Sequence, residues 1–129
     1  MESVITRITP DLITTLKPGE IFVFGSNAQG VHAGGAALFA LNHFGAEWGV
    51  GEGLQGQSYA IPTMEGIDSL KLAVDRFIAF AGQHPEYKFL VTPIGCGIAG
   101  YRESQIGPLF AQAVGLPNVF LPGGFWEVL

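Results

Sequence analysis

Charge, cysteine and long apolar runs are all scarce in this sequence. Charged residues make up 13% of its 129 residues, about half the usual share, and hydrophobic residues make up 48%. So little charge is typical of a surface that another subunit covers in part, and a homo-oligomer is therefore one candidate state. A single cysteine forms no intrachain disulfide and builds no cysteine-based zinc site, which fits a reducing compartment.

No apolar run approaches the roughly 18 consecutive residues that a membrane-spanning helix needs, because Gly and Pro interrupt the apolar stretches. Glu2 follows Met1, and the first residues carry neither the basic start nor the apolar core of an export signal. We therefore expect a cytoplasmic protein that does not insert into a membrane.

Positive charge is also in short supply. Six Lys and Arg stand against eleven Asp and Glu, which gives a formal net charge of -5. Binding along a nucleic-acid backbone relies on clustered positive charge, so we expect no nucleic-acid partner. An anionic ligand has to be held by something other than basic side chains. The three histidines have no metal-ligand spacing, so we predict no metal, and nothing in the pattern predicts a cofactor.

What the sequence does contain is a series of short segments typical of β-strands, rich in β-branched and aromatic residues. They cover residues 4–8, 20–24, 58–61, 88–92 and 118–121. The runs IFVF and FLV within them are continuously apolar, as expected of a strand that is covered on both faces.

Helical patterns lie between these strands. The clearest covers residues 68–84, where apolar residues recur at helical spacing and Asp68 is a candidate N-cap. Thr9 followed by proline predicts a short helix within residues 9–19, and a last helix is predicted within residues 102–115.

Alternating strands and helices predict one domain, residues 1–129, built as a three-layer α/β/α sandwich. We expect a mixed, largely parallel sheet of about five or six strands, with helices on both of its faces.

Segments poor in side chains follow several of the predicted strands. They are Gly25-Ser26-Asn27, Thr63, Ile94-Gly95-Cys96-Gly97 and Gly123-Gly124. Because ligands of open α/β sheets bind outside the carboxyl ends of the strands, these loops are expected to converge on one crevice. Glycine lets backbone N–H groups approach a phosphate closely, and the start of a following helix adds partial positive charge. Tight turns and close packing explain the same glycines equally well, and spacing alone does not decide between the two interpretations.

Two longer segments resemble a known family. Residues 25–45, GSNAQGVHAGGAALFALNHFG, and residues 92–110, TPIGCGIAGYRESQIGPLF, are similar to the macrodomain, the ADP-ribose-binding α/β/α module. The resemblance is closest to the small branch that removes ADP-ribose from glutamate. It covers about two thirds of the chain and keeps the order of the segments, with residues 58–63 placed like the strand between them.

The resemblance implies a crevice built from residues 25–35, residues 94–99 and the loop after residue 121. Gly34 and Gly35 would begin a helix beside the diphosphate, and Asn27 would lie near the distal ribose. The loop after the last strand would place an aromatic residue against the adenine or ribose. The candidate ligand-binding residues are Gly25, Ser26, Asn27, His32, Gly34, Gly35, Thr63, Ile94, Gly95, Cys96, Gly97, Ile98 and Phe125.

The catalytic residues of the family are not carried over. The glutamate-specific branch has a lysine where this chain has Thr63-Met64, and an aspartate where it has Ala99. The other hydrolase branch has an aspartate in the loop that enters the first long helix, but residues 28–37 contain no carboxylate. The resemblance therefore implies binding without either of these hydrolytic mechanisms.

Three further features of the sequence are each open to two interpretations. His32 is a candidate acid or base beside the ligand, or a histidine in a surface loop. Cys96 is a candidate nucleophile near helix-start amides, or a small buried filler. The loop formed by residues 45–57 either covers the ligand or bridges to the next strand.

The leading hypothesis is a macrodomain-like module that binds ADP-ribose or a related nucleotide diphosphate through glycine-rich backbone loops. One alternative is an ADP-ribosyl hydrolase that uses a non-standard residue such as His32. Another is a non-catalytic interaction domain that forms an oligomer.

Overall fold

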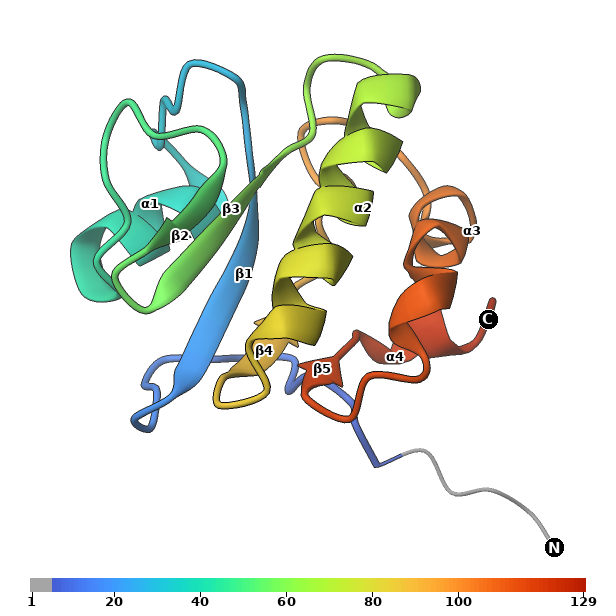
Figure 1. Cartoon of the computed structure of the whole chain (residues 1–129). Coiled ribbons are helices and arrows are strands. Elements are labelled where there is room, and N and C mark those ends of the chain that lie inside the picture. The colour runs from blue at the N-terminus through green and yellow to red at the C-terminus, as the bar shows by residue number, and fades with distance from the viewer. Residues whose placement is uncertain (1–5) are drawn as a thin grey trace, which may run out of the picture.

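The computed structural model describes residues 6–129, and its helices and strands are labelled in Figure 1. Their order along the chain is β1 (Glu20–Ser26), α1 (Gly35–His43), β2 (Gly53–Gln55), β3 (Ser58–Pro62), α2 (Ile67–Gln83), β4 (Lys88–Val91), α3 (Glu103–Ile106), the 3-10 helix η1 (Gly107–Ala113), β5 (Val119–Phe120) and α4 (Gly123–Trp126).

The strands form one five-stranded sheet in the order β2-β3-β1-β4-β5. β1 is central and pairs in parallel with both β3 and β4, so that Phe22 lies between Ser58 and Leu90. β5 is parallel to β4, and only β2 is antiparallel to its neighbour. The predicted α/β fold with a mixed, largely parallel sheet is confirmed, with five strands.

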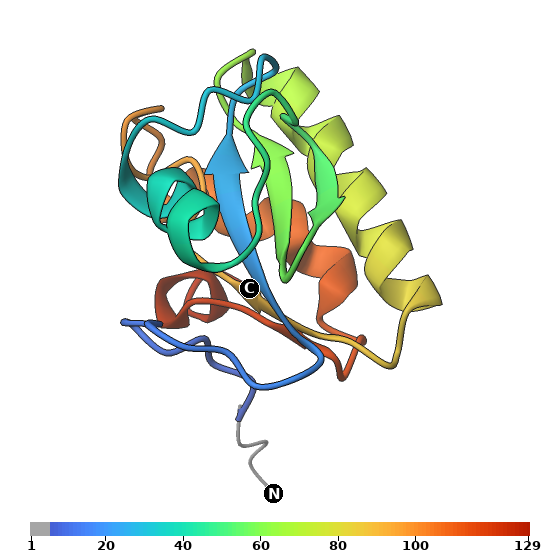
Figure 2. The same ribbon diagram turned by 90° about the vertical axis from the view of Figure 1, so that its left-hand side faces the viewer.

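The two faces of the sheet carry separate apolar cores. Ile21 and Val23 of β1 belong to a core that includes Phe77 of α2 and Phe110 of η1. Phe22 and Phe24, which point the opposite way because side chains alternate along a strand, belong to a second core with α1. Figure 2 shows α1 in front of the sheet and α2 behind it. The sheet is therefore the middle layer of three.

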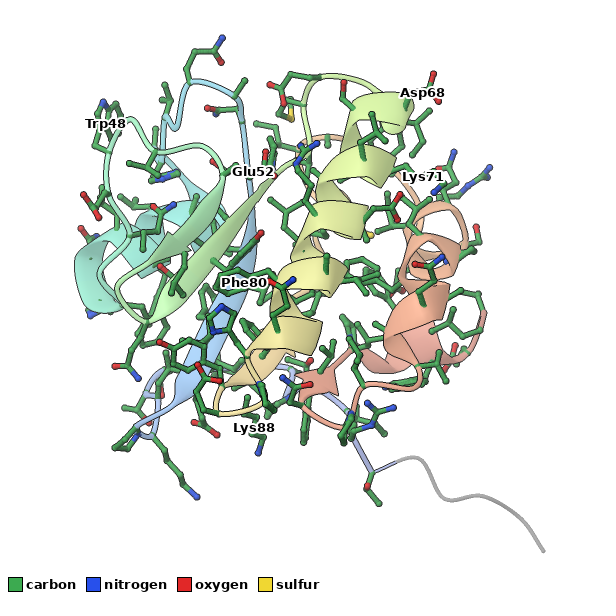
Figure 3. The ribbon with its side chains drawn as sticks, viewed as in Figure 1. Trp48, Glu52, Asp68, Lys71, Phe80 and Lys88 are labelled. Carbon is green, nitrogen blue, oxygen red and sulfur yellow. The ribbon has the colours of Figure 1, made fainter. Side chains whose placement is uncertain are left out.

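Helix α2 forms because its apolar residues fall on one face. Leu70, Val74 and Phe77 are fully buried against the sheet, and each such burial stabilises the fold by roughly 2 kcal/mol. The N-cap position is occupied by Gly66, so the prediction that Asp68 caps this helix is wrong. Asp68 lies in the first turn (Figure 3), where its negative charge suits the helix dipole.

The helix predicted within residues 9–19 does not form, because residues 10–16 contain no helical turn. A run of β-branched residues from Ile13 to Thr15 disfavours a helix, and the N–H of Thr9 donates instead to the carbonyl of Leu121 at 2.9 Å. The predicted first strand, residues 4–8, lies partly outside the described residues. Within them, Ile8 forms a single parallel bridge to Leu121.

The last predicted helix is α-helical only in α3 and continues as the 3-10 helix η1. Pro108 has no N–H to donate to the carbonyl four residues earlier, so the α-helical ladder is interrupted at this point. The short strand β2 was not predicted. Glu52, which is labelled in Figure 3, immediately precedes this strand. Its Oε2 lies 2.6 Å from Nε of Arg76 in α2.

Candidate functional site

A cleft of about 450 Å³ lies at the carboxyl ends of β1, β3 and β4. Figure 2 shows the segments that follow β1 and β4, cyan and orange, beside each other at the upper edge of the sheet. The cleft is lined by Gly25, Ser26, Asn27, Val31, Ala33, Gly34, Gly35, Ala36, Ala37, Thr63, Met64, Thr92, Pro93, Ile94, Gly95, Gly97, Ile98 and Ala99.

The structure brings most of the candidate binding residues into this one cleft. Those that line it are Gly25, Ser26, Asn27, Gly34, Gly35, Thr63, Ile94, Gly95, Gly97 and Ile98. His32, Cys96 and Phe125 do not line it. The two glycine loops therefore share a cavity, although they are about sixty residues apart in the sequence.

One wall of the cleft is the start of α1. Gly34 is the N-cap and has an extended backbone, while Gly35 has a φ of 57°, a left-handed conformation that favours glycine. The first N–H groups of a helix have no partner within it, and α1 has no side-chain cap bond at this end. These amides, with the positive end of the helix dipole, are available to an anion.

The opposite wall is the loop formed by residues 94–99. Within residues 6–129, the N–H groups of Gly95, Gly97, Ile98 and Ala99 have no hydrogen-bond partner. Gly95 has a φ of 75°, and an added Cβ would lie 3.2 Å from Cδ1 of Ile106, so both the backbone conformation and the space favour glycine there. No charged side chain lines the described cleft, so its polarity comes mainly from backbone donors.

Asn27 lines the cleft, but its side chain closes its own loop. Its Oδ1 accepts from the N–H of Val31 at 2.8 Å, and its Nδ2 donates to the carbonyl of the same residue at 3.2 Å. Only the second N–H and the second lone pair of the amide remain for a ligand hydroxyl. Asn27 therefore shapes the wall of the cleft, in addition to any direct contact it makes with a sugar.

His32 lies behind the cleft and is fully buried, so it is not a surface-loop histidine and does not line the cleft directly. Its ring contacts Phe24 edge-on, with the ring centroids 5.2 Å apart. Nε2 lies 3.1 Å from the carbonyl oxygen of Val50, and Nδ1 lies 3.4 Å from Oγ of Ser26. The ring fills the space beneath the loop after β1, and it reaches the cleft only through Ser26.

Cys96 and Phe125 also point away from the cleft. Cys96 is half-buried against the main core, and burial, followed by the negative charge of Glu103, raises the pKa of its thiol. A raised pKa disfavours the thiolate, which is the nucleophilic form. Phe125 is fully buried and packs against Phe110, with the ring centroids 5.5 Å apart, so it is not available to an adenine. The indole N–H of Trp126 donates to the carbonyl of Arg7 at 2.7 Å.

The loop formed by residues 45–57 bridges to β3 and supports the cleft from outside. The N–H of Gly49 donates to the carbonyl of Gly30 at 2.9 Å. A Cβ added to Gly51 would lie 2.3 Å from the carbonyl oxygen of Asn27, so the two backbones are in direct contact. No residue of this loop lines the cleft.

A second cavity, of about 380 Å³, adjoins the cleft and was not predicted. It shares Gly35, Ala36, Thr92 and Pro93 with the cleft, and its other lining residues are Thr9, Pro10, Asp11, Leu12, Ile13, Phe22, Phe39 and Pro122. Pro122 is the contribution of the loop after residue 121. We refer to this cavity as the apolar pocket.

Thr9 gives the apolar pocket an unusual polar group. The residue is 4% exposed, and its Oγ1 has no hydrogen-bond partner among the described residues. This part of the site was not predicted because residues 9–19 were assigned to a helix. The available signal was the Thr9-Pro10-Asp11 stretch, because such residues are also typical of turns.

Within residues 6–129, no three His, Cys, Asp or Glu side chains come together as a metal site. No helix in this range is long and apolar enough to cross a membrane. Comparisons with protein-family models, with curated proteins and with solved structures gave no match.

Proposed function

We propose that this chain is a macrodomain-like module that binds ADP-ribose or a related nucleotide diphosphate. The observation that carries the proposal is the meeting of two sets of unpartnered backbone amides, at the start of α1 and in the loop formed by residues 94–99, around one cleft. Amides arranged in this way bind phosphate oxygens without basic side chains. An acidic chain can therefore hold a pyrophosphate.

The apolar pocket supports the same ligand class. Because it adjoins the cleft at Gly35 and Pro93, a ligand with its pyrophosphate in the cleft can place a base or ribose in the pocket. The pocket is mostly apolar, with the hydroxyls of Thr9 and Thr92 and the carboxylate of Asp11 as side-chain acceptors. An apolar cavity with a few polar groups suits a nucleobase, whose faces are apolar and whose edges form hydrogen bonds.

The residues at the end of the cleft support binding over the hydrolytic mechanisms of the two related branches. Thr63-Met64 and Ala99 occupy the positions at which the resemblance would require a lysine and an aspartate, and all three residues line the cleft. None of them supplies the amine that forms the covalent adduct or the carboxylate that transfers the proton. His32, the alternative acid or base, does not face the cleft.

Calorimetric titration with ADP-ribose and with AMP tests the proposal, and Gly34→Val is the informative variant. A Cβ at Gly34 meets nothing within 4 Å and its backbone is extended, so valine adds bulk at the cleft without strain. We expect the affinity for ADP-ribose to fall by about 10-fold or more, since the loss of a few phosphate contacts costs that much.

Gly115→Val is the matched control, because Gly115 also has open space around it and does not line the cleft. It should bind ADP-ribose as the wild type does. The absence of heat at submillimolar wild-type protein and ligand would contradict the proposal, and so would equal binding by both valine variants.

A further inference from the structure

Ser26 and His32 form a pair that nucleotide binding leaves unexplained. Ser26 is at the end of β1 and lines the cleft, while the imidazole of His32 is fully buried directly behind it. The 3.4 Å between Oγ and Nδ1 is long for a hydrogen bond, as is common for a catalytic pair in the absence of a ligand. Ser26 is itself 5% exposed, and its Oγ also lies 3.3 Å from the carbonyl oxygen of Asn27. A buried base thus lies beside the hydroxyl of a residue that lines the cleft.

The surroundings of His32 determine which ring nitrogen is free to accept a proton. Val50 presents a carbonyl oxygen to Nε2 at 3.1 Å, and a carbonyl can only accept, so Nε2 carries the hydrogen. In the neutral ring Nδ1 is then an unprotonated acceptor facing Ser26. Gln55 donates to the same carbonyl at 3.1 Å and helps to hold it in place.

The rest of the cleft supplies the other requirements of acyl transfer. The N–H groups of Gly97, Ile98 and Ala99 are unpartnered among the described residues, and such donors stabilise an oxyanion. Three exposed apolar side chains, those of Val31, Met64 and Ile98, also line this cavity, with exposures of 43%, 46% and 95%. A nucleophile, amide donors and an apolar surface therefore share one cleft, and the base lies directly behind it.

We propose that Ser26 and His32 are a nucleophile and general base that hydrolyse carboxylic esters with an apolar acyl group. The acyl group would lie against Val31, Met64 and Ile98. This activity goes beyond nucleotide binding and does not require it.

The reaction balances with water as the only co-reactant. Oγ of Ser26 bonds to the ester carbonyl carbon while its proton moves to Nδ1 of His32. The bond to the alcohol oxygen breaks, and the alcohol leaves with that proton. Water then attacks the acyl-serine, gives one proton to Nδ1 and releases the acid, after which Oγ recovers the proton.

The test uses the full-length chain, a fluorophosphonate probe and p-nitrophenyl butyrate. We expect the probe to label Ser26, as located by peptide mass spectrometry, and p-nitrophenol to be released faster than in buffer. Ser26→Ala should abolish both signals. Ser104→Ala, a change of an exposed serine on α3, should leave both unchanged. A folded wild type that is neither labelled at Ser26 nor active on the ester overturns the proposal.

His32→Gln tests the base, because glutamine retains an amide donor for the carbonyl of Val50 but cannot accept a proton. We expect ester turnover to fall by about 100-fold, the lower range for loss of a general base. ADP-ribose affinity should change little, whereas the melting temperature should fall because the buried contact of the ring with Phe24 is lost. Wild-type turnover in His32→Gln overturns the role of His32, and if this variant does not fold, labelling and Ser26→Ala decide. Loss of ADP-ribose binding alone, with Ser26 still reactive, contradicts only the proposed function.

Discussion

The cleft and the apolar pocket adjoin each other, yet they are built in different ways. The cleft is lined largely by glycine and other small residues, and its polar groups are mostly backbone amides. The pocket is lined by larger side chains such as Leu12, Phe22 and Phe39. One cavity thus depends on where the backbone runs, and the other depends on which side chains surround it.

This difference determines how each cavity responds to mutation. A cavity lined by backbone loses its shape when a substitution displaces the chain, even if the substituted residue lies outside the cavity. A side-chain wall changes locally, because the sheet and α1 hold the surrounding backbone in place. The following variants use this difference to separate the two cavities.

The largest effect is expected from Gly51→Ala, which is outside both cavities. The new Cβ would lie 2.3 Å from the carbonyl oxygen of Asn27 and 2.6 Å from that of Ala28, so the backbone of the cleft wall has to move. We expect a loss of roughly 3 kcal/mol in the free energy of unfolding, measured by urea denaturation. ADP-ribose binding should weaken as well.

Gly115→Ala provides the control for this experiment, because an added Cβ there meets nothing within 4 Å. If the Gly51 variant is as stable as this control and binds ADP-ribose normally, the loop formed by residues 45–57 does not support the cleft.

An intermediate effect, with opposite signs for stability and binding, is expected from Thr9→Val in the apolar pocket. Valine removes a buried hydroxyl that has no partner among the described residues, so the free energy of unfolding should rise by about 1 kcal/mol. The affinity for AMP should fall because the pocket loses an acceptor. Thermal unfolding and calorimetry give the two quantities, and destabilisation together with unchanged AMP binding would show that this hydroxyl serves the fold alone.

The smallest effect concerns Cys96, which is in the cleft loop but faces the core. Burial and Glu103 raise the pKa of its thiol, so alkylation by iodoacetamide should reach half of its maximal rate at a higher pH than for free cysteine. Stability linked to this thiol is present below the ordinary thiol pKa and is lost as the pH rises through the folded-state pKa. Glu103→Gln should lower the midpoint slightly. A midpoint below that of free cysteine would contradict the buried position.

Local patterns in the sequence were sufficient for the main elements of the fold. The apolar runs at residues 20–24 and 88–92 correctly predicted β1 and β4, and helical spacing predicted α2. These elements are buried, so their hydrophobic pattern follows directly from their environment. The segment within residues 9–19 was misassigned because a threonine followed by a proline begins a turn as readily as a helix.

The candidate site, like the fold, was predictable from the sequence only in part. Glycine after β1 and β4 indicated which loops meet, because parallel strands end at the same edge of a sheet. The burial of His32, the engagement of Asn27 by Val31 and the core position of Phe125 depend on contacts between distant segments. No local spacing predicts such contacts.

The sequence by itself determined the strand and helix pattern of this protein and the glycines that leave backbone amides uncovered, because both follow from local chemistry and periodicity. Only the tertiary structure decided that Thr9 borders a pocket beside those amides and that the buried ring of His32 lies against Ser26. The physical reason is that both arrangements result from packing across the sheet, where the free energy of burial outweighs the local preference of any single residue.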